Sequence, residues 1–405
     1  MKKFILDNGI KIIYKKNENN ITSFNIAVNA GAIVEDSNEY GISHAVEHMV
    51  FKGTKNRTEI EINRECDNIF GFHNAMTNYP YVVYYGTCLN EDFEKGIDIY
   101  SDIVLNPNFD EKNFEEEISV ICEELKEWKD DTSQYCEDKL FLNGFNNRRI
   151  KELIIGNENS IKNFTIKDLK DFYQKHYKSE NMTISVVSSL DFDKVVSIIK
   201  KYFNIESNKN DEIDKKVSLY EENKSGVFVE NKDGINSCKI QYVFPIHELN
   251  NREIALLRIF NSYFGEGTSS ILYDEVRTKK GLVYDINARL KNELGIKLYT
   301  INLGTSHENI DTAIEIINKE IEKVKNISNV FDEEKINSII KTCKLKRILG
   351  LEKSITMSFN IATYELMYGD CNILFEEFNI ENVTEEEILN VVNKVLKNPS
   401  IQIIK

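Results

Sequence analysis

The sequence predicts an α+β protein of two structurally similar halves, each a mainly antiparallel sheet packed with helices. Three observations lead to this prediction. Helical and strand patterns are mixed along the chain without strict β-α alternation, and a helix-then-strand unit occurs once in each half. The 405 residues are 41% hydrophobic and 29% charged, which is an ordinary globular composition for a chain of two or three domains.

The repeated unit is a Thr that opens an amphipathic helix, followed by a short apolar strand. Thr165 opens the first copy, which leads to the strand at 182–188. Thr384, which lies 219 residues further along, opens the second copy, which leads to the strand at 400–404. A Thr before a polar-then-apolar helical pattern is typical of an N-cap. An offset of a little over half the chain therefore predicts an internal duplication.

We accordingly expect an N-terminal domain over 1–203 and a homologous C-terminal domain over 225–405. The stretch 204–224 between them is rich in Asn, Asp, Glu, Lys and Ser and follows an apolar helical segment. Such a polar stretch is typical of a linker.

The chain begins with a predicted hairpin, because Asp7-Asn8-Gly9 is a turn sequence between two runs rich in apolar residues. The other elements are predicted from hydrophobic spacing. In the first half, strands are expected at 3–6, 10–15, 22–30, 73–78, 81–88 and 182–188, and helices near 41–52, 58–70, 91–104, 110–143, 165–176 and 191–203. In the second half, strands are expected near 226–231, 238–244, 283–291, 296–303 and 400–404, and helices near 250–264, 268–279, 308–325, 332–368 and 384–396.

Composition excludes several classes of protein. The net charge of −15 disfavours a nucleic-acid partner, because phosphate binding needs clustered Lys and Arg. No apolar run reaches the roughly 18 to 20 residues that span a bilayer, and Asp7 ends the first apolar run too early for a signal peptide. The seven cysteines are scattered and form no C-x-x-C motif. We therefore expect reduced thiols, a cytoplasmic location and no membrane partner.

The segment 41–54 contains the residues that point to metal binding and catalysis. Two of the six histidines stand in an H-x-x-E-H motif formed by His44, Glu47 and His48. On a helix, His44 and His48 lie about 40° apart on one face, with Glu47 about 60° to the other side of His44. Two imidazoles one turn apart can bind a single Zn²⁺, while the neighbouring carboxylate reaches a water without ligating the metal.

A catalytic zinc needs a third protein ligand and an open position. The helix predicted at 110–143 is dense with carboxylates, and a solvated helix face is the ordinary reason for such a cluster. Glu117 and Glu124 are seven residues apart and therefore share one face of this helix. Periodicity alone does not decide between Glu124 and its neighbour Glu123 as the third ligand.

The segment 41–54 closely resembles the zinc-binding helix of the pitrilysin, insulinase and mitochondrial-processing-peptidase family, G-L-A-H-x-x-E-H-M-x-F-K-G-T. The length resembles that of the short, bacterial-type processing peptidases of this family. The resemblance implies that the third ligand is Glu124, within V-I-C-E-E-L, and that Glu117 is the acid that orients the site. It also implies a fold of two similar α+β halves around an enclosed chamber.

Two further segments resemble the family. Asn74-Ala75-Met76-Thr77 resembles its N-A-Y-T strand, whose Asn74 and Ala75 positions pair with substrate backbone; Met76 departs from the usual Tyr. The stretch 264–284 resembles its L-G-x-G-x-S-S…V-R-x-x-x-G-L-x-Y block. By this resemblance, Arg277 anchors a substrate carbonyl and Tyr284 donates a hydrogen bond to the developing oxyanion, so that both take part in catalysis.

The sequence thus predicts a zinc-dependent endopeptidase with one Zn²⁺ per chain, ligated by His44, His48 and Glu124, with Glu47 as the base. Peptides or unstructured segments are the expected substrates, including a precursor peptide. The chain carries both the zinc motif and the Arg/Tyr element, which favours a self-sufficient homodimer or monomer, with a heterodimer containing a related subunit as the alternative. The alternative function is a non-catalytic partner subunit or a peptide-binding scaffold, although such relatives usually lose the zinc ligands. A structural zinc is disfavoured, because no cysteine has suitable spacing.

Overall fold

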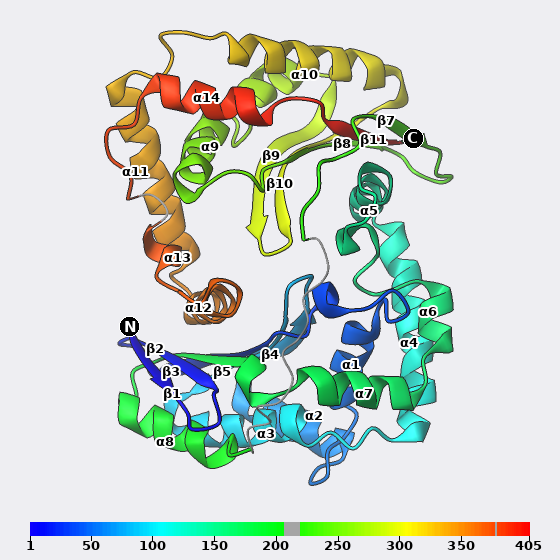
Figure 1. The fold of residues 1–405 in the computed structure, drawn as a ribbon, viewed down its shortest axis with the longest axis vertical. Coiled ribbons are helices and arrows are strands. Elements are labelled where there is room, and N and C mark those ends of the chain that lie inside the picture. The colour runs from blue at the N-terminus through cyan, green and yellow to red at the C-terminus, as the bar shows by residue number, and fades with distance from the viewer. Residues whose placement is uncertain (206–218, 377–378) are drawn as a thin grey trace. The chain divides into compact units, whose positions relative to one another are not determined.

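The computed structural model describes residues 1–205, 219–376 and 379–405 (Figure 1). The chain forms two compact units that interleave along the sequence. Unit 1 comprises Met1–Lys126, Leu153–Lys216 and Gly350–Leu374, and unit 2 comprises Glu127–Glu152, Val217–Leu349 and Phe375–Lys405. Each unit therefore contains a short segment from the other half of the chain. Part of the linker predicted over 204–224 lies outside the described residues.

Unit 1 contains a six-stranded sheet with the order β1-β2-β6-β3-β5-β4. Every neighbouring pair is antiparallel except β2 and β6, so the prediction of a mainly antiparallel sheet is confirmed for this unit. The N-terminal hairpin is present, with Gly9 in a left-handed turn between β1 and β2. The strands are β1 (Lys2–Ile5), β2 (Lys11–Lys16), β3 (Ile21–Val28), β4 (Phe70–Thr77), β5 (Val82–Leu89) and β6 (Met182–Ser188).

Helices cover both faces of this sheet. Successive side chains of β3 therefore pack into two different hydrophobic clusters. Phe24 and Ile26 point into the core that contains α1, α3, α7 and α8, whereas Ala27 packs on the other side with Ala362 of α12. Figure 1 shows α12 lying across the face opposite α3 and α8. The helices of unit 1 are α1 (Ile42–Val50), α2 (Glu59–Ile69), α3 (Phe93–Leu105), α4 (Glu111–Asp130, whose last turn belongs to unit 2), α6 (Glu158–Asn163), α7 (Ile166–His176), α8 (Phe192–Tyr202), α12 (Ser354–Tyr368) and the start of α13 (Ile373–Glu376).

Unit 2 repeats the plan with a five-stranded sheet of order β7-β11-β8-β10-β9, in which only β7 and β11 are parallel. The helix α5, from the first half of the sequence, packs against β8 and β11. The strands are β7 (Gly226–Glu230), β8 (Cys238–Pro245), β9 (Val283–Glu293), β10 (Ile296–Thr305) and β11 (Ser400–Ile404). The helices are α5 (Thr132–Gly144), α9 (Asn251–Phe264), a π-helical segment (Tyr273–Thr278), α10 (Ile310–Lys325), α11 (Glu333–Gly350) and α14 (Glu385–Val395).

Two predicted helices are wrong in length, because each is two helices. The helix predicted at 110–143 is interrupted where the Asp131 side chain accepts hydrogen bonds from the backbone N–H groups of Ser133 and Gln134 and begins α5. The helix predicted at 332–368 ends at Gly350, and α12 begins after Lys353. These two interruptions let α5 and α12 pack on different units. The predicted N-caps Thr165 and Thr384 do begin helices, each with a reciprocal capping box.

Within the described residues, no helix is both long enough and apolar enough to cross a membrane. All seven cysteines are free thiols, and six of them are buried. Burial raises the pKa of several of these thiols, including Cys66 and Cys88 to about 12, which keeps them protonated and inert.

The loop that follows α1 is held on α3 by one buried carboxylate, that of Asp102. It accepts hydrogen bonds from the Thr54 hydroxyl at 2.6 Å, the Asn56 amide at 2.6 Å and the Arg57 guanidinium at 2.9 Å. Burial raises the pKa of Asp102, but these hydrogen bonds and one from Asn106 outweigh it and leave the pKa below its usual value. The carboxylate therefore fixes the loop that follows α1 relative to α3.

We predict that Asp102→Asn lowers the free energy of unfolding by about 3 kcal/mol at pH 7, because it leaves buried donors without an anionic acceptor. Asp98→Asn is the matched control. Asp98 pairs with the same guanidinium at 2.7 Å but is 40% exposed, so its loss should cost less than about 1 kcal/mol. Because the folded pKa of Asp102 is lowered, its contribution is present above the unfolded pKa and is lost as the pH falls through the folded value. Urea unfolding at pH 7 and at acidic pH measures both effects, and equal losses in the two variants would contradict this account.

Candidate metal centre

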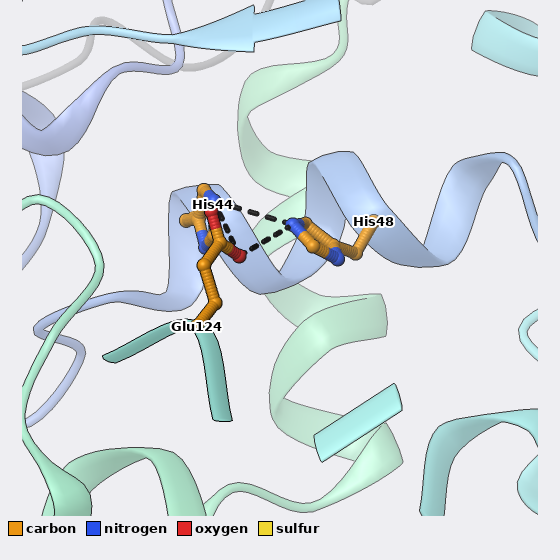
Figure 2. Close-up of side chains that lie close together, drawn as sticks. All are labelled: His44, His48 and Glu124. Carbon is orange, nitrogen blue, oxygen red and sulfur yellow. Dashed lines mark hydrogen bonds and ion pairs between the residues drawn. The ribbon is translucent and has the colours of Figure 1, made fainter. Parts of the chain in front are cut away.

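The two motif histidines lie on one face of α1, and their Nε2 atoms are 3.2 Å apart (Figure 2). The start of α1 is fixed by a buried carboxylate, because Glu35 accepts hydrogen bonds from the backbone N–H groups of Gly41 and Ser43. Gly41 has φ +98°, and a Cβ at this position would lie 2.5 Å from the Ile155 carbonyl oxygen. Glycine is therefore required at this position, because a side chain would collide with the neighbouring backbone and would disfavour the left-handed conformation that precedes α1.

Glu124 reaches these histidines from α4. Its Oε2 lies 3.5 Å from His48 Nε2 and 3.8 Å from His44 Nε2, and Figure 2 shows the carboxylate directed at both imidazoles. Ligand atoms at 2.0–2.1 Å in a tetrahedral zinc site are about 3.3 Å apart. The donor set and its spacing therefore fit zinc. The neighbouring Glu123 is 71% exposed and pairs with Lys126 at 2.6 Å, so the geometry favours Glu124.

Burial sets the protonation state that a metal ligand requires. It lowers the pKa of His44 to about 3, with a further contribution from the positive charge of His48, so the His44 ring is neutral near pH 7. A neutral imidazole has a free nitrogen lone pair for a metal, whereas imidazolium has none. This arrangement is consistent with the chemistry that a zinc ligand needs.

Glu117 orients the second imidazole. Its Oε1 accepts a hydrogen bond from His48 Nδ1 at 2.7 Å, and its Oε2 pairs with Lys52 Nζ at 2.7 Å. Burial raises the pKa of Glu117, but the hydrogen bonds from His48 and Lys52 outweigh it, so the pKa is lowered and the group is anionic. Burial lowers the pKa of His48, but the hydrogen bond to Glu117 and the charges of Glu47, Glu117 and Glu124 outweigh it, so the pKa is raised and the ring carries a positive charge more readily than a free imidazole. A metal ion bound at Nε2 would take the place of the second proton, while Glu117 keeps the proton on Nδ1.

Glu47 stands beside the three ligand candidates. Its Oε2 accepts a hydrogen bond of 2.5 Å from the hydroxyl of Thr77, the last residue of β4. Burial raises the pKa of Glu47, and the Thr77 hydrogen bond and the charge of His48 only partly oppose this shift. A buried carboxyl group beside a candidate metal position stands where a general base is needed.

The predicted substrate strand is β4, which forms one edge of the unit 1 sheet. Asn74 is exposed there, and the N–H of Ala75 donates to the Asn74 side-chain oxygen at 2.9 Å. An edge strand can accept a further strand through its free backbone groups. The geometry of Asn74 and Ala75 is thus compatible with the predicted role.

Arg277 and Tyr284 belong to unit 2, whereas His44, His48 and Glu124 belong to unit 1. The Arg277 guanidinium lies over the Tyr273 ring, 4.8 Å from its centroid. Tyr284, on β9, is 60% exposed. The part of these two residues in a catalytic site stays a prediction.

Lys52 and Thr77 are the site residues that sequence reasoning missed, although both lie inside the motifs it used. Lys52 is four residues after His48 and so continues the same helical face. Thr77 is two residues after Ala75 and so points to the same side of β4. Spacing identifies Thr77 once α1 is known to pack against β4, and Lys52 once Glu117 of α4 is known to face α1.

Comparison with known proteins identifies the family. Residues 11–158 match the family model described as "Insulinase (Peptidase family M16)", and residues 163–343 match "Peptidase M16 inactive domain". The chain belongs to the M16 (insulinase) peptidase family. The predicted resemblance is therefore confirmed, and all three ligand candidates lie in the segment that matches the first of these models.

Relatives of this M16 chain include proteins named as zinc proteases. It is 28% identical over 396 residues to an uncharacterized zinc protease of Rickettsia felis, over 97% of this chain and 94% of the relative. It is 34% identical over 200 residues to the mitochondrial-processing peptidase subunit beta of Saccharomyces cerevisiae, over 49% of this chain and 43% of the relative. A solved protease from Helicobacter pylori superposes with a TM-score of 0.89 at 22% identity, over 100% of this chain and 99% of that one, which confirms the fold.

We predict that Glu124→Gln weakens zinc binding by about tenfold or more, because an amide oxygen replaces an anionic ligand. Glu123→Gln is the matched control and should leave the zinc dissociation constant unchanged. Competition with a chromophoric chelator measures both constants. A weaker site in the Glu123 variant and an unchanged one in the Glu124 variant would move the third ligand by one residue.

Proposed function

We propose that this M16 chain is a zinc-dependent endopeptidase that cleaves peptides or unstructured segments at internal bonds. The observation that carries the proposal is the convergence of His44, His48 and Glu124 beside Glu47. Three protein ligands with a neighbouring unligated carboxylate are typical of a catalytic rather than a structural zinc site. One Zn²⁺ per chain, held by this group of unit 1, is part of the proposal.

Bound zinc supplies a Lewis acid that polarises the scissile carbonyl and makes a water more acidic. Glu47 then acts as general base: it takes the proton from the attacking water and passes it to the leaving amine. Burial raises the pKa of Glu47, which makes the carboxylate a stronger base toward a neighbouring water. Glu117 holds the His48 ring, so the imidazole does not reorient during the reaction.

The substrate is held as an added strand on β4. A substrate carbonyl replaces the Asn74 side chain as acceptor for the Ala75 N–H, and further backbone pairs extend along the edge. This mode of binding reads backbone more than side chains, which suits peptides and unstructured segments. Arg277 and Tyr284 are proposed to anchor a carbonyl and to stabilise the oxyanion, and enclosure of the substrate in a chamber stays a prediction.

A non-catalytic partner subunit or peptide-binding scaffold is the second candidate. The relative from Saccharomyces cerevisiae is named as one subunit of a processing peptidase, which suggests that this chain also works with a partner. A homodimer or a heterodimer with a related subunit is therefore proposed, as is processing of a precursor peptide. A cytoplasmic location, suggested by the free cysteines, stays a prediction.

We predict that Glu47→Gln keeps zinc and loses at least about 100-fold in kcat, because general base catalysis contributes that much or more. The variant keeps the shape of the side chain and the acceptor oxygen for Thr77, so folding and metal content should not change. Mass spectrometry of a pool of unstructured peptides measures the cleavage. Parental cleavage by the Glu47 variant would show that the base is another residue, and no cleavage by the zinc-loaded wild type would favour the scaffold.

A further inference from the structure

We infer that Thr77 is a positioning residue, through which the substrate-binding strand β4 fixes the orientation of the Glu47 carboxylate. This inference rests on the proposed function and deepens it. Its basis is the 2.5 Å hydrogen bond from Thr77 Oγ1 to Glu47 Oε2, which joins the edge strand to the motif helix. Thr77 need not touch the substrate; its proposed effect acts through Glu47.

Side chains on β4 point alternately to two faces, one exposed and one packed against the protein. Asn74 and Met76 are exposed on one face, whereas Ala75 and Thr77, on the alternate face, are buried or partly buried. The α1 helix packs against β4, so the side chain of Thr77 meets Glu47 there. The same four residues thus provide a free edge for peptide backbone and a hydroxyl group for the base.

Thr77 holds the Glu47 carboxylate through two groups, its hydroxyl at 2.5 Å and its backbone N–H. In the part of the chain that the structure describes, Thr77 is the one residue that donates hydrogen bonds to this carboxylate, while the carboxylates of Glu117 and Glu124 are paired with other groups. Without the hydroxyl, the carboxylate loses the short contact that fixes its rotamer, and the backbone N–H of Thr77 is the restraint that remains. Since a displacement of about 1 Å can cost roughly 100-fold in rate, the orientation of Glu47 is a sensitive quantity.

The hydrogen bond between Thr77 and Glu47 couples peptide binding on β4 to the position of the base. A peptide that adds to the edge of β4 pairs with the strand on which Thr77 lies, only two residues from Ala75. Strand addition restrains β4, and through the Thr77 hydroxyl it also restrains the Glu47 carboxylate. Correct seating of a peptide backbone and correct aim of the base are therefore coupled.

Two substitutions separate this role from simple packing. Thr77→Val keeps the shape and favours a β-strand but removes the hydroxyl, whereas Thr77→Ser keeps the hydroxyl and loses a methyl group. If Thr77 only packs, the Val variant should be the more stable and the more active of the two. If Thr77 positions Glu47, the Val variant should be at least as stable, yet far less active than the Ser variant.

We expect Thr77→Val to lower kcat roughly 10- to 100-fold with KM within about twofold of the wild type. Thr77→Ser should keep kcat within about threefold. The matched control is Thr87→Val on β5, whose hydroxyl lies 2.8 Å from Ser23 Oγ instead, and this variant should keep the parental kcat. Chelator competition should give the same zinc affinity for all four proteins.

A binding measurement completes the test without relying on turnover. In the Glu47→Gln background, a fluorescently labelled peptide that the wild type cleaves should bind with the same dissociation constant whether residue 77 is Thr or Val. In that background, Thr77→Val should also lower the residual rate by less than twofold, because the base is already absent.

Parental kcat in Thr77→Val, or a loss of peptide or zinc affinity that accounts for its lower activity, would overturn the inference. A greater activity in the Val variant than in the Ser variant would overturn it as well. A zinc-loaded wild type that cleaves no peptide would remove the proposed function and this inference together, whereas an active wild type with an unaffected Val variant would remove the inference alone.

Discussion

The Glu117 carboxylate is the connection on which the candidate metal centre depends. One oxygen of Glu117 bonds His48 on α1, and the other bonds Lys52, which lies just after the C-terminal end of that helix. The carboxylate therefore joins α4 to the last turn of α1 and to the residue that follows it on the same side. Glu124 lies two turns further along α4 and reaches the imidazoles because this contact sets the distance and rotation between the two helices. Both oxygens of a buried carboxylate are thus used to align three ligand candidates that come from two helices, α1 and α4.

The carboxylates around this candidate centre favour the binding of a cation. Glu47, Glu117 and Glu124 surround a neutral His44, and Lys52 offsets only part of their charge. Crowding of carboxylates at a partly buried site is unfavourable unless a positive group compensates it. A divalent metal at the proposed site would supply that compensation and stabilise the ionised form of Glu47. The same electrostatics would then support both the proposed metal binding and the proposed base.

The sequence was informative where chemistry is carried by local spacing. The H-x-x-E-H motif predicted the paired imidazoles, and the repeated Thr-initiated helices predicted two similar halves, each with a mainly antiparallel sheet. It was less informative where tertiary packing decides. The apolar spacing continues across Asp131 and across 351–353. The sequence pattern therefore did not predict the helix interruptions at these two places, after which α5 packs in unit 2 and α12 in unit 1. Glu123 and Glu124 differ by one helical position, and their exposure follows from the packing of α4 against α1, which periodicity does not contain.

The most direct test of the central claim is cleavage of an unstructured peptide pool by the purified chain, before and after removal of zinc with a chelator. The account predicts internal cuts that disappear on chelation and return when stoichiometric zinc is added back, at one Zn²⁺ per chain. Cleavage that continues unchanged in protein shown by elemental analysis to contain no metal would contradict it.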